Sequence, residues 1–226
     1  MSPDQSDHSD SEDSSNDSGS NATPVESLVD RIFKQFEESV FDKDDFLPDG
    51  CIDRLITKEA VISELTLTQD DLKKDSTAKL LNFILRKGKL IFAILLVAGF
   101  QGTQLVKAVT QFRKSKMGDS SLPITEEIKR NTPFFGSWSQ SSSHNFLKKQ
   151  WAFLSPVFSQ ERKNLELHPK VILPFTCQAD SVKSGAFGEV HQVTVHPSHH
   201  KDPVLTVRIS LSHPISALQV HLSKFG

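Results

Sequence analysis

Eleven consecutive residues from Leu90 to Phe100, LIFAILLVAGF, carry no polar or charged side chain. A helix that crosses a bilayer needs about 20 apolar residues. The run is therefore too short for a membrane span, and we expect it to form a helix buried in the centre of a folded domain. The opposing hypothesis, a membrane tether through this run, requires the chain to sediment with membranes.

Helical periodicity precedes this run. Apolar residues recur at intervals of three and four over 24–40, which predicts an amphipathic helix. Thr23 and Glu26 have the spacing of a capping box, and Pro24 occupies the first helical position, where its missing N–H costs nothing. We therefore predict one helix over 24–40.

More helices are predicted on both sides of the run. Thr57 and Thr68 are candidate caps, and Gly88 divides a longer helical pattern into either one bent helix or two. The segment 115–145 is rich in Gly, Ser and Pro and is predicted to be a loop. Helical faces are predicted in three segments: 76–97, 105–112 and 146–158.

The amino-terminal segment 1–22 is acidic and rich in serine. Its composition cannot bury enough apolar surface to offset chain entropy, so we predict that it is disordered. Ser9 and Ser14 each precede an acid by three residues, which suits acidophilic phosphorylation; a solvated spacer is the alternative. The segment contains no Lys or Arg and six acids: Asp4, Asp7, Asp10, Glu12, Asp13 and Asp17.

The periodicity changes from Lys170 onward. Three short runs rich in β-branched residues, VILPF, VHQVTV and VLTVRI, predict strands. The expected fold class is α+β. A mainly α-helical domain over 23–160 is followed by a small, incomplete antiparallel β-sheet over 170–226.

A glycine-rich segment, KSGAFGEV at 183–190, is the main candidate for a ligand site. Gly185 and Gly188 would let the backbone approach phosphate oxygens closely, with N–H groups directed at the anion. The protein-kinase pattern is G-x-G-x-x-G-x-V, and Lys183 stands here at the first glycine position. An ordinary β-hairpin turn has a similar sequence.

The remaining residues of this segment have expected places as well. Ala186 and Phe187 form the loop tip, where Phe187 would cover the phosphates. Val190 would lie on the returning strand, under an adenine ring. The site expected from the pattern is therefore one for ATP.

The sequence VKSGAFGEVHQVTVHPSHH resembles the first two strands of a protein kinase amino-terminal lobe. The stretch before it is similar to the helical region ahead of the kinase domain in a group of fungal kinase-like proteins, through LPDGCIDRLITKEAV, LLNFILRKGKLIFAILLVAGFQG, FLKKQWAFLSPVFS and VILPF. The resemblance covers about residues 24–200. It implies serine/threonine kinase ancestry and ATP binding, with these residues near the nucleotide: Gly185, Ala186, Phe187, Gly188, Val190 and Arg208.

Phosphoryl transfer needs more than this loop. Protein kinases use a lysine on the third strand, its glutamate partner, a catalytic aspartate and a magnesium-binding aspartate. LTVR offers Arg208 instead, whose wide guanidinium fork is no substitute for a compact ammonium, and no acid follows Asp202. We expect a truncated, catalytically inactive kinase-like protein with weak ATP binding and no metal site. A non-catalytic helical module for protein–protein interaction is the alternative.

Other classes of function receive little support. The net charge is −2 and the basic stretch 107–116 is short, so we expect no nucleic-acid partner. Cys51 and Cys177 lie far apart, and the polar amino terminus does not have the composition of a secretory signal, which favours a reducing intracellular compartment.

Four histidines lie within ten residues: His191, His196, His199 and His200. Their spacing matches no common zinc site, so we expect no metal centre here. In the kinase resemblance, HPSHH at 196–200 falls in a surface turn between two strands.

Overall fold

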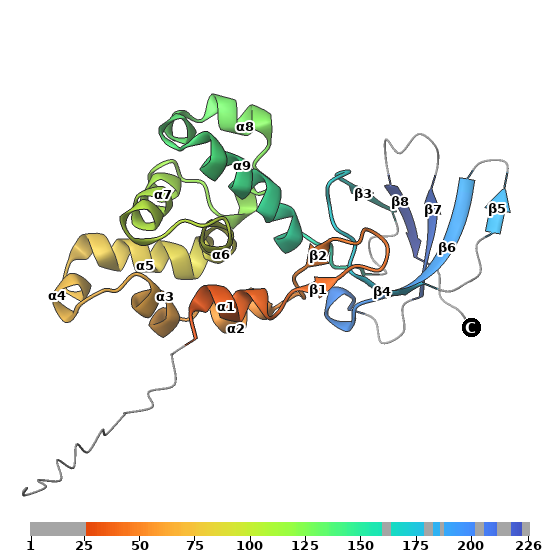
Figure 1. Ribbon diagram of the computed structural model, residues 1–226, viewed down its shortest axis with the longest axis horizontal. Coiled ribbons are helices and arrows are strands. Elements are labelled where there is room, and N and C mark those ends of the chain that lie inside the picture. The colour runs from red at the N-terminus through yellow and green to blue at the C-terminus, as the bar shows by residue number, and fades with distance from the viewer. Residues whose placement is uncertain are drawn as a thin grey trace, which may run out of the picture.

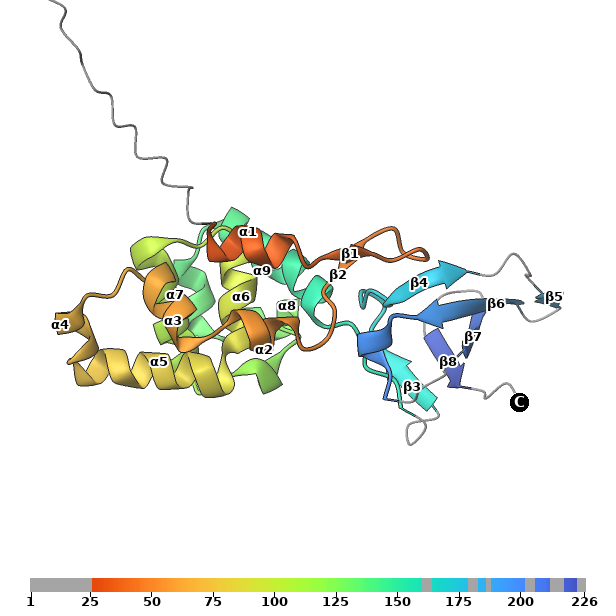
Figure 2. The same ribbon diagram turned by 90° about the horizontal axis from the view of Figure 1, so that it is seen from below.

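A computed structural model describes residues 26–159, 164–178, 183–185, 188–201, 206–211 and 218–222. The helices gather at one end of the molecule and the strands at the other, and both views show this separation (Figures 1 and 2). Mainly helical structure with antiparallel sheets agrees with the expected α+β class. The predicted disorder of 1–22 and the predicted cap at Thr23 lie outside the described residues.

The described α-helices occupy the first two thirds of the chain. The α-helices are α1 Leu28–Phe33, α2 Cys51–Leu55, α3 Lys58–Glu64, α4 Gln69–Leu72, α5 Asp75–Lys87, α6 Lys89–Val97, α7 Gly102–Lys114, α8 Glu126–Asn131 and α9 Gln140–Lys149. Short 3-10 helices are η1 Asp119–Ser121, η2 Pro133–Ser137, η3 Gln150–Phe153 and η4 Pro197–His199. The predicted caps are confirmed, since the Thr57 and Thr68 side chains accept the backbone N–H groups of Ala60 and Asp71.

Helix α6 forms the centre of the helical core. Its residues from Ile91 to Val97 are buried, and α1, α2, α5, α7 and α9 pack around it. The prediction of a buried helix within 90–100 is confirmed. Within the described ranges, no helix combines the length and the apolar character that a bilayer crossing requires.

Helix α5 ends directly before Gly88 and α6 begins directly after it, so the pattern forms two helices and not one bent helix. A Cβ atom at Gly88 would lie 2.9 Å from Cε1 of Phe83, a distance that would force the ring to move. Gly99 follows the end of α6 with a φ of +91°, a conformation that glycine adopts at low cost.

The prediction of one helix over 24–40 is wrong. Helix α1 begins after Ser27, whose Oγ accepts the backbone N–H of Asp30, and it ends at Phe33. The following residues form a two-stranded antiparallel hairpin, β1 Glu37–Glu38 and β2 Asp45–Phe46. Periodicity failed here because Val40 packs against the core of the distant sheet, whereas Phe36 still packs against the helical core.

The prediction of a loop over 115–145 is also wrong. Helices α8 and α9 begin in this segment, and each has a side-chain cap, from Thr125 and Ser139 respectively. Between them, Phe135 and Trp138 pack edge-on at 4.8 Å, and Trp138 packs on Phe146 of α9. Aromatic burial therefore orders a segment whose composition is typical of loops.

The second sheet contains six described strands, and each pair is antiparallel. They are β3 Asn164–Leu167, β4 Phe175–Gln178, β5 Lys183–Gly185, β6 Gly188–Val195, β7 Thr206–Leu211 and β8 Leu218–Leu222. Their order is β3-β8-β7-β6-β4, and β5 also pairs with β6. The predicted strands in VHQVTV and in the described part of VLTVRI are confirmed, whereas VILPF becomes a strand only at its last residue, Phe175. Strands β3 and β8 were not predicted.

A smaller apolar core joins the hairpin to this sheet. Phe158, Phe175 and Val193 are buried in it, and Val40 and Phe41 pack against them. Val40 N–H donates to the carbonyl of Phe175 at 2.9 Å. The hairpin thus belongs to the sheet's packing although it interrupts the helical part of the sequence.

Candidate functional site

The predicted glycine loop lies in the β5–β6 hairpin. Gly185 and Gly188 are paired as the last residues of the antiparallel register. Ala186 and Phe187 connect them and lie outside the described residues. A two-residue connection is the shortest common hairpin loop, so the two glycines stand directly beside the turn.

The neighbouring strand brings the predicted arginine position into the same sheet. Val190 pairs with Lys183 on one side and with Ser210 on the other. Arg208 lies opposite Gln192 in β6 and opposite His221 in β8. The predicted positions 185, 188, 190 and 208 therefore fall on adjacent strands of one antiparallel meander.

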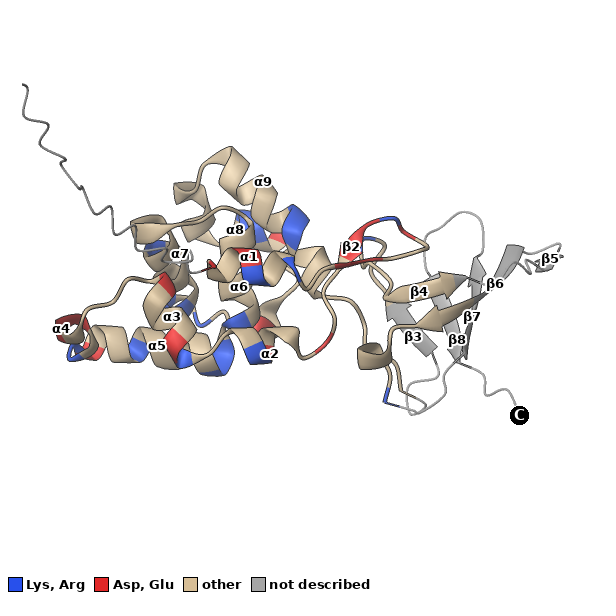
Figure 3. Cartoon of the chain, turned by 60° about the horizontal axis from the view of Figure 1, so that its bottom comes forward, with Lys and Arg blue, Asp and Glu red and all other residues tan. Residues whose placement is uncertain are grey.

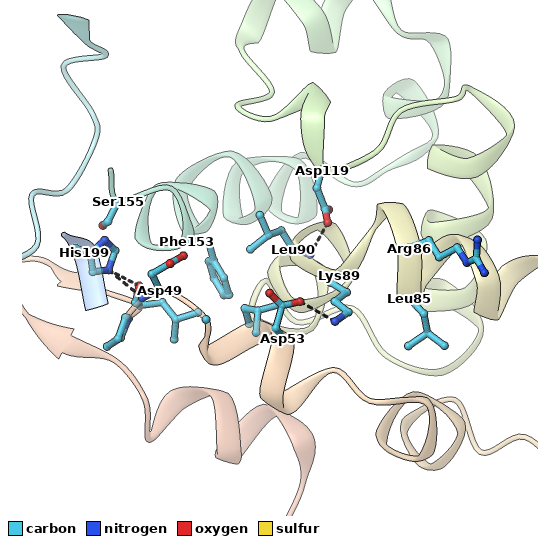
Figure 4. A pocket seen from close by; sticks show the side chains of 14 residues that line it. Asp49, Asp53, Leu85, Arg86, Lys89, Leu90, Asp119, Phe153, Ser155 and His199 are labelled. Atoms are coloured by element: carbon cyan, nitrogen blue, oxygen red, sulfur yellow. Dashed lines mark hydrogen bonds and ion pairs between the residues drawn. The ribbon is translucent and has the colours of Figure 1, made fainter. Parts of the chain in front are cut away.

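A second candidate site lies where the helices meet the sheet. A cavity of about 290 Å³ opens there, between the turn that ends at Gly50, the start of α6 and the short helix η4. Figure 4 shows three aspartates, Lys89 and His199 around it. Gly50 turns the chain with a φ of +78°, which starts α2 at the cavity wall.

His199 is the most buried polar group of this cavity, with 2% of its surface exposed. The backbone N–H of Asp49 donates to Nε2 at 3.1 Å, so Nδ1 carries the proton and donates to the carbonyl of Pro156 at 3.0 Å. Burial lowers the pKa of His199 below its ordinary value, although the carbonyls of Pro156 and Leu47 act in the opposite direction. The ring is therefore neutral and has both nitrogens engaged at neutral pH.

The prediction that HPSHH lies in a surface turn is wrong for His199. Its ring packs edge-on against Phe46 of β2 at 5.5 Å, inside the contact between hairpin and sheet. No local pattern distinguishes it from His196 or His200, because its partners Asp49 and Pro156 lie 150 and 43 residues earlier. Among the described residues, no three His, Cys, Asp or Glu side chains are placed to hold a metal ion.

The carboxylate of Asp119 closes the opposite wall of the cavity. It accepts the backbone N–H groups of Leu90 at 3.2 Å and Ile91 at 2.9 Å, which are unpaired donors in the first turn of α6. Burial raises the pKa of Asp119, and these two hydrogen bonds partly offset that rise. No local pattern indicates this role, since Asp119 is 29 residues from Leu90 in the chain.

The charged pair of the cavity is also engaged. Lys89 Nζ lies 2.7 Å from Oδ1 of Asp53, and this ion pair joins the starts of α6 and α2. Ser155 Oγ donates to the carbonyl of Ile172. The side chains of His199 and Asp119 are both hydrogen-bonded to backbone groups. The residues around the cavity therefore connect the helical part of the chain to the sheet, and they do not place a nucleophile beside a base.

No protein-family model, curated protein or solved structure matches this chain. The fold is that of a mainly helical protein with antiparallel sheets, in which Gly185 and Gly188 flank the turn of the β5–β6 hairpin.

Proposed function

We propose that this chain is a protein-kinase-like module that holds a nucleoside triphosphate weakly at the β5–β6 hairpin and does not transfer its phosphate. The register of Gly185 with Gly188 carries the proposal. This pairing supports a hairpin turn of two residues that is flanked on each side by a glycine. Backbone N–H groups at such a tip are accessible to phosphate oxygens.

The strand order supports the same function. In a kinase-like arrangement, a hairpin with the glycine loop is followed by a third antiparallel strand that carries a cation. Here β7 follows β6 in antiparallel register, and Arg208 lies two positions from the partner of Val190. Arg208 supplies a cation for a nucleotide phosphate in this proposal.

The chemistry of the sequence after β6 argues against turnover. Between His196 and Gly226 the one acid is Asp202, so this stretch offers neither a metal-binding pair of carboxylates nor a glutamate partner for Arg208. Phosphoryl transfer relies on such groups to position magnesium and the attacking hydroxyl. Binding without transfer is the function that these residues support.

A titration with a fluorescent ATP analogue tests the proposal on the full chain. We expect saturable binding to the wild type that unlabelled ATP displaces, and at least tenfold weaker binding to Gly188→Asp, because a carboxylate at the hairpin repels phosphate. Gly136→Asp is the matched control, since a Cβ atom at Gly136 meets nothing within 4 Å and this position lies in η2. Equal binding by wild type and Gly188→Asp would refute nucleotide binding at the hairpin.

Two further measurements sharpen this test. Arg208→Gln is expected to weaken binding without changing the far-ultraviolet circular dichroism spectrum. Incubation with γ-labelled ATP and magnesium is expected to leave a generic protein acceptor unlabelled. Transfer of label that Arg208→Gln abolishes would show that the chain is an active kinase.

The alternative function is a non-catalytic helical module for protein–protein interaction. It is favoured by the separation of the two apolar cores, since the helical core is built from residues between Leu28 and Phe153. A helical body with its own core can present a binding surface without help from the sheet. Absence of nucleotide binding by the wild type, Gly188→Asp and Gly136→Asp would favour this alternative.

A further inference from the structure

A basic cleft of about 410 Å³ lies where the carboxyl ends of α5 and α7 meet. None of the residues that line it is acidic, and five are cations: Lys79, Arg86, Lys87, Arg113 and Lys116. Figure 3 shows several Lys and Arg positions along and beside α5, whereas the β1–β2 hairpin carries mostly acids. The cleft is separate from both sites described above, sharing only Arg86 with the edge of the cavity at His199.

Of the five cations of this cleft, only Lys79 has an ion-pair partner among the described residues. Lys79 pairs with Asp75 at 2.5 Å, outside the cleft lining. Ion pairs seen elsewhere on the helical surface join neighbouring residues of opposite charge, as in α4 and α8. The side chains of Arg86, Lys87 and Lys116 make no such pair with a described residue.

Arg113 has an unmet hydrogen-bond donor at this position. Its Nε is buried, and no acceptor among the described residues lies within hydrogen-bond distance. Guanidinium groups are always charged in proteins, and buried donors without a partner are rare because they cost free energy. An anion bound to this guanidinium would supply an acceptor.

The backbone brings the two helix ends together closely enough to concentrate this charge. A Cβ atom at Gly118 would lie 2.5 Å from the carbonyl oxygen of Lys87, so only glycine allows the chain to pass there. Lys116 adopts a φ of +57° after the end of α7, at a position where glycine is usual. A lysine at this position adds a cation to the cleft at a conformational cost.

We infer that the basic cleft binds a phosphate monoester within an acidic segment, and that its occupant is the chain's own segment 1–22 phosphorylated at Ser9 or Ser14. Phosphate presents several strong acceptor oxygens, which match the forked donors of Arg86 and Arg113. A separate acidophilic kinase installs the group: the γ-phosphoryl of ATP moves to the serine Oγ, and ADP and the hydroxyl proton are released.

Charge and connectivity favour the chain's own segment over a free ligand. Residues 1–22 carry six acids and no Lys or Arg, opposite to the cleft in sign. A tethered segment binds at an effective concentration in the millimolar range, which a separate peptide rarely reaches. The fourteen residues from Ser14 to Leu28 span up to about 46 Å when extended, more than the roughly 36 Å diameter of a helical body of this size.

Nuclear magnetic resonance of the full chain tests this inference directly. The Nε–Hε signal of Arg113, assigned by its loss in Arg113→Lys, is recorded before and after phosphorylation of Ser9 and Ser14 by an acidophilic kinase. We expect phosphorylation to shift this signal, and phosphatase or 0.5 M NaCl to reverse the shift, because exposed ionic contacts are screened by salt. An unchanged signal would overturn the inference.

A phosphopeptide of residues 7–17 distinguishes the source of the ligand. It should bind the unphosphorylated full chain, and the phosphorylated chain should require at least tenfold more peptide because its own segment competes. Equal binding to both chains would show that the segment is not the occupant. Tighter binding of a single-stranded oligonucleotide than of the phosphopeptide would show that the ligand class is wrong.

Variants separate loss of the site from loss of the fold. Arg113→Gln should weaken the phosphopeptide about tenfold or more, as expected for a charge-assisted hydrogen bond. Lys116→Gly should weaken it too, yet keep or raise the melting temperature, since glycine suits the positive φ. Lys114→Gln, on the same helix end but outside the cleft lining, is the control and should bind normally. Equal affinities for all three variants would overturn the site.

Discussion

The backbone N–H of Asp49 donates to Nε2 of His199 across 3.1 Å, although the two residues are 150 positions apart in sequence. The other ring nitrogen of His199 donates to the carbonyl of Pro156. One imidazole thus joins the turn before α2, the segment after η3 and the short helix η4. This contact, and the hairpin beside it, connects the helical part of the chain to the sheet.

Replacement of His199 by Phe should weaken this connection. The ring contact with Phe46 can persist, but the carbonyl of Pro156 loses its donor, and only Ser198 Oγ remains to accept from Asp49 N–H. We expect the free energy of unfolding to fall by about 2 kcal/mol, the usual cost of an unpaired buried polar group. Urea denaturation measures this change. His144→Phe, on the exposed face of α9, should change it by less than about 0.5 kcal/mol.

Stability should depend on pH through the same histidine. Burial lowers the pKa of folded His199 below the ordinary value of 6.5, so the unfolded chain binds more protons in the window below that value. Stability therefore falls as the pH drops from 6.5 toward the lowered pKa, and the contribution of His199 is complete above 6.5.

Urea midpoints between about pH 5 and pH 8 measure this dependence. Carboxylates with raised pKa values, such as Asp119, act with the opposite sign at lower pH. The difference between wild type and His199→Phe isolates the histidine, because both proteins contain the same carboxylates. A difference that stays constant across the range would contradict the assignment.

The carboxylate of Asp119 should stabilise the fold by accepting hydrogen bonds from the first turn of α6. Asp119→Ala leaves the N–H groups of Leu90 and Ile91 without their partner, and we expect a loss of about 1–2 kcal/mol, as for a lost helix cap. Asp119→Asn keeps one oxygen and removes a buried charge, so it should lose less. Thermal unfolding followed by circular dichroism compares the two, and equal losses would show that the acceptor is unimportant.

Local sequence information was sufficient for parts of the fold whose partners are near in the chain. Thr57 and Thr68 cap helices through hydrogen bonds that span three residues, so composition alone identified them. The burial of α6 followed from the length of its apolar run, which is independent of any particular partner. Strands β6 and β7 were identified from their β-branched runs.

Local information failed where distant residues decide the conformation. Val40 fits a helical period, yet it packs with Phe175, about 135 positions later, in the smaller core of the sheet. His199 and Asp119 were missed for the same reason, since each serves backbone groups of another segment. For the glycine hairpin, sequence identified the two residues that pair, and the ligand remains a proposal.

Gln150 gives the sharpest test of a buried polar group in this fold. It is 1% exposed, its Oε1 accepts from Ile124 N–H at 2.8 Å, and its Nε2 donates to the carbonyl of Ile124 at 2.8 Å. Gln150→Leu keeps the volume but leaves both backbone groups of Ile124 unpaired, which should cost about 2–4 kcal/mol. Differential scanning calorimetry should show a melting temperature lower by roughly 4–16 °C, given about 2–4 °C per kcal/mol for a chain of this size. Gln140→Leu, at the exposed start of α9, is the matched control, and an equal shift in both variants would show that the Ile124 contacts do not stabilise the protein.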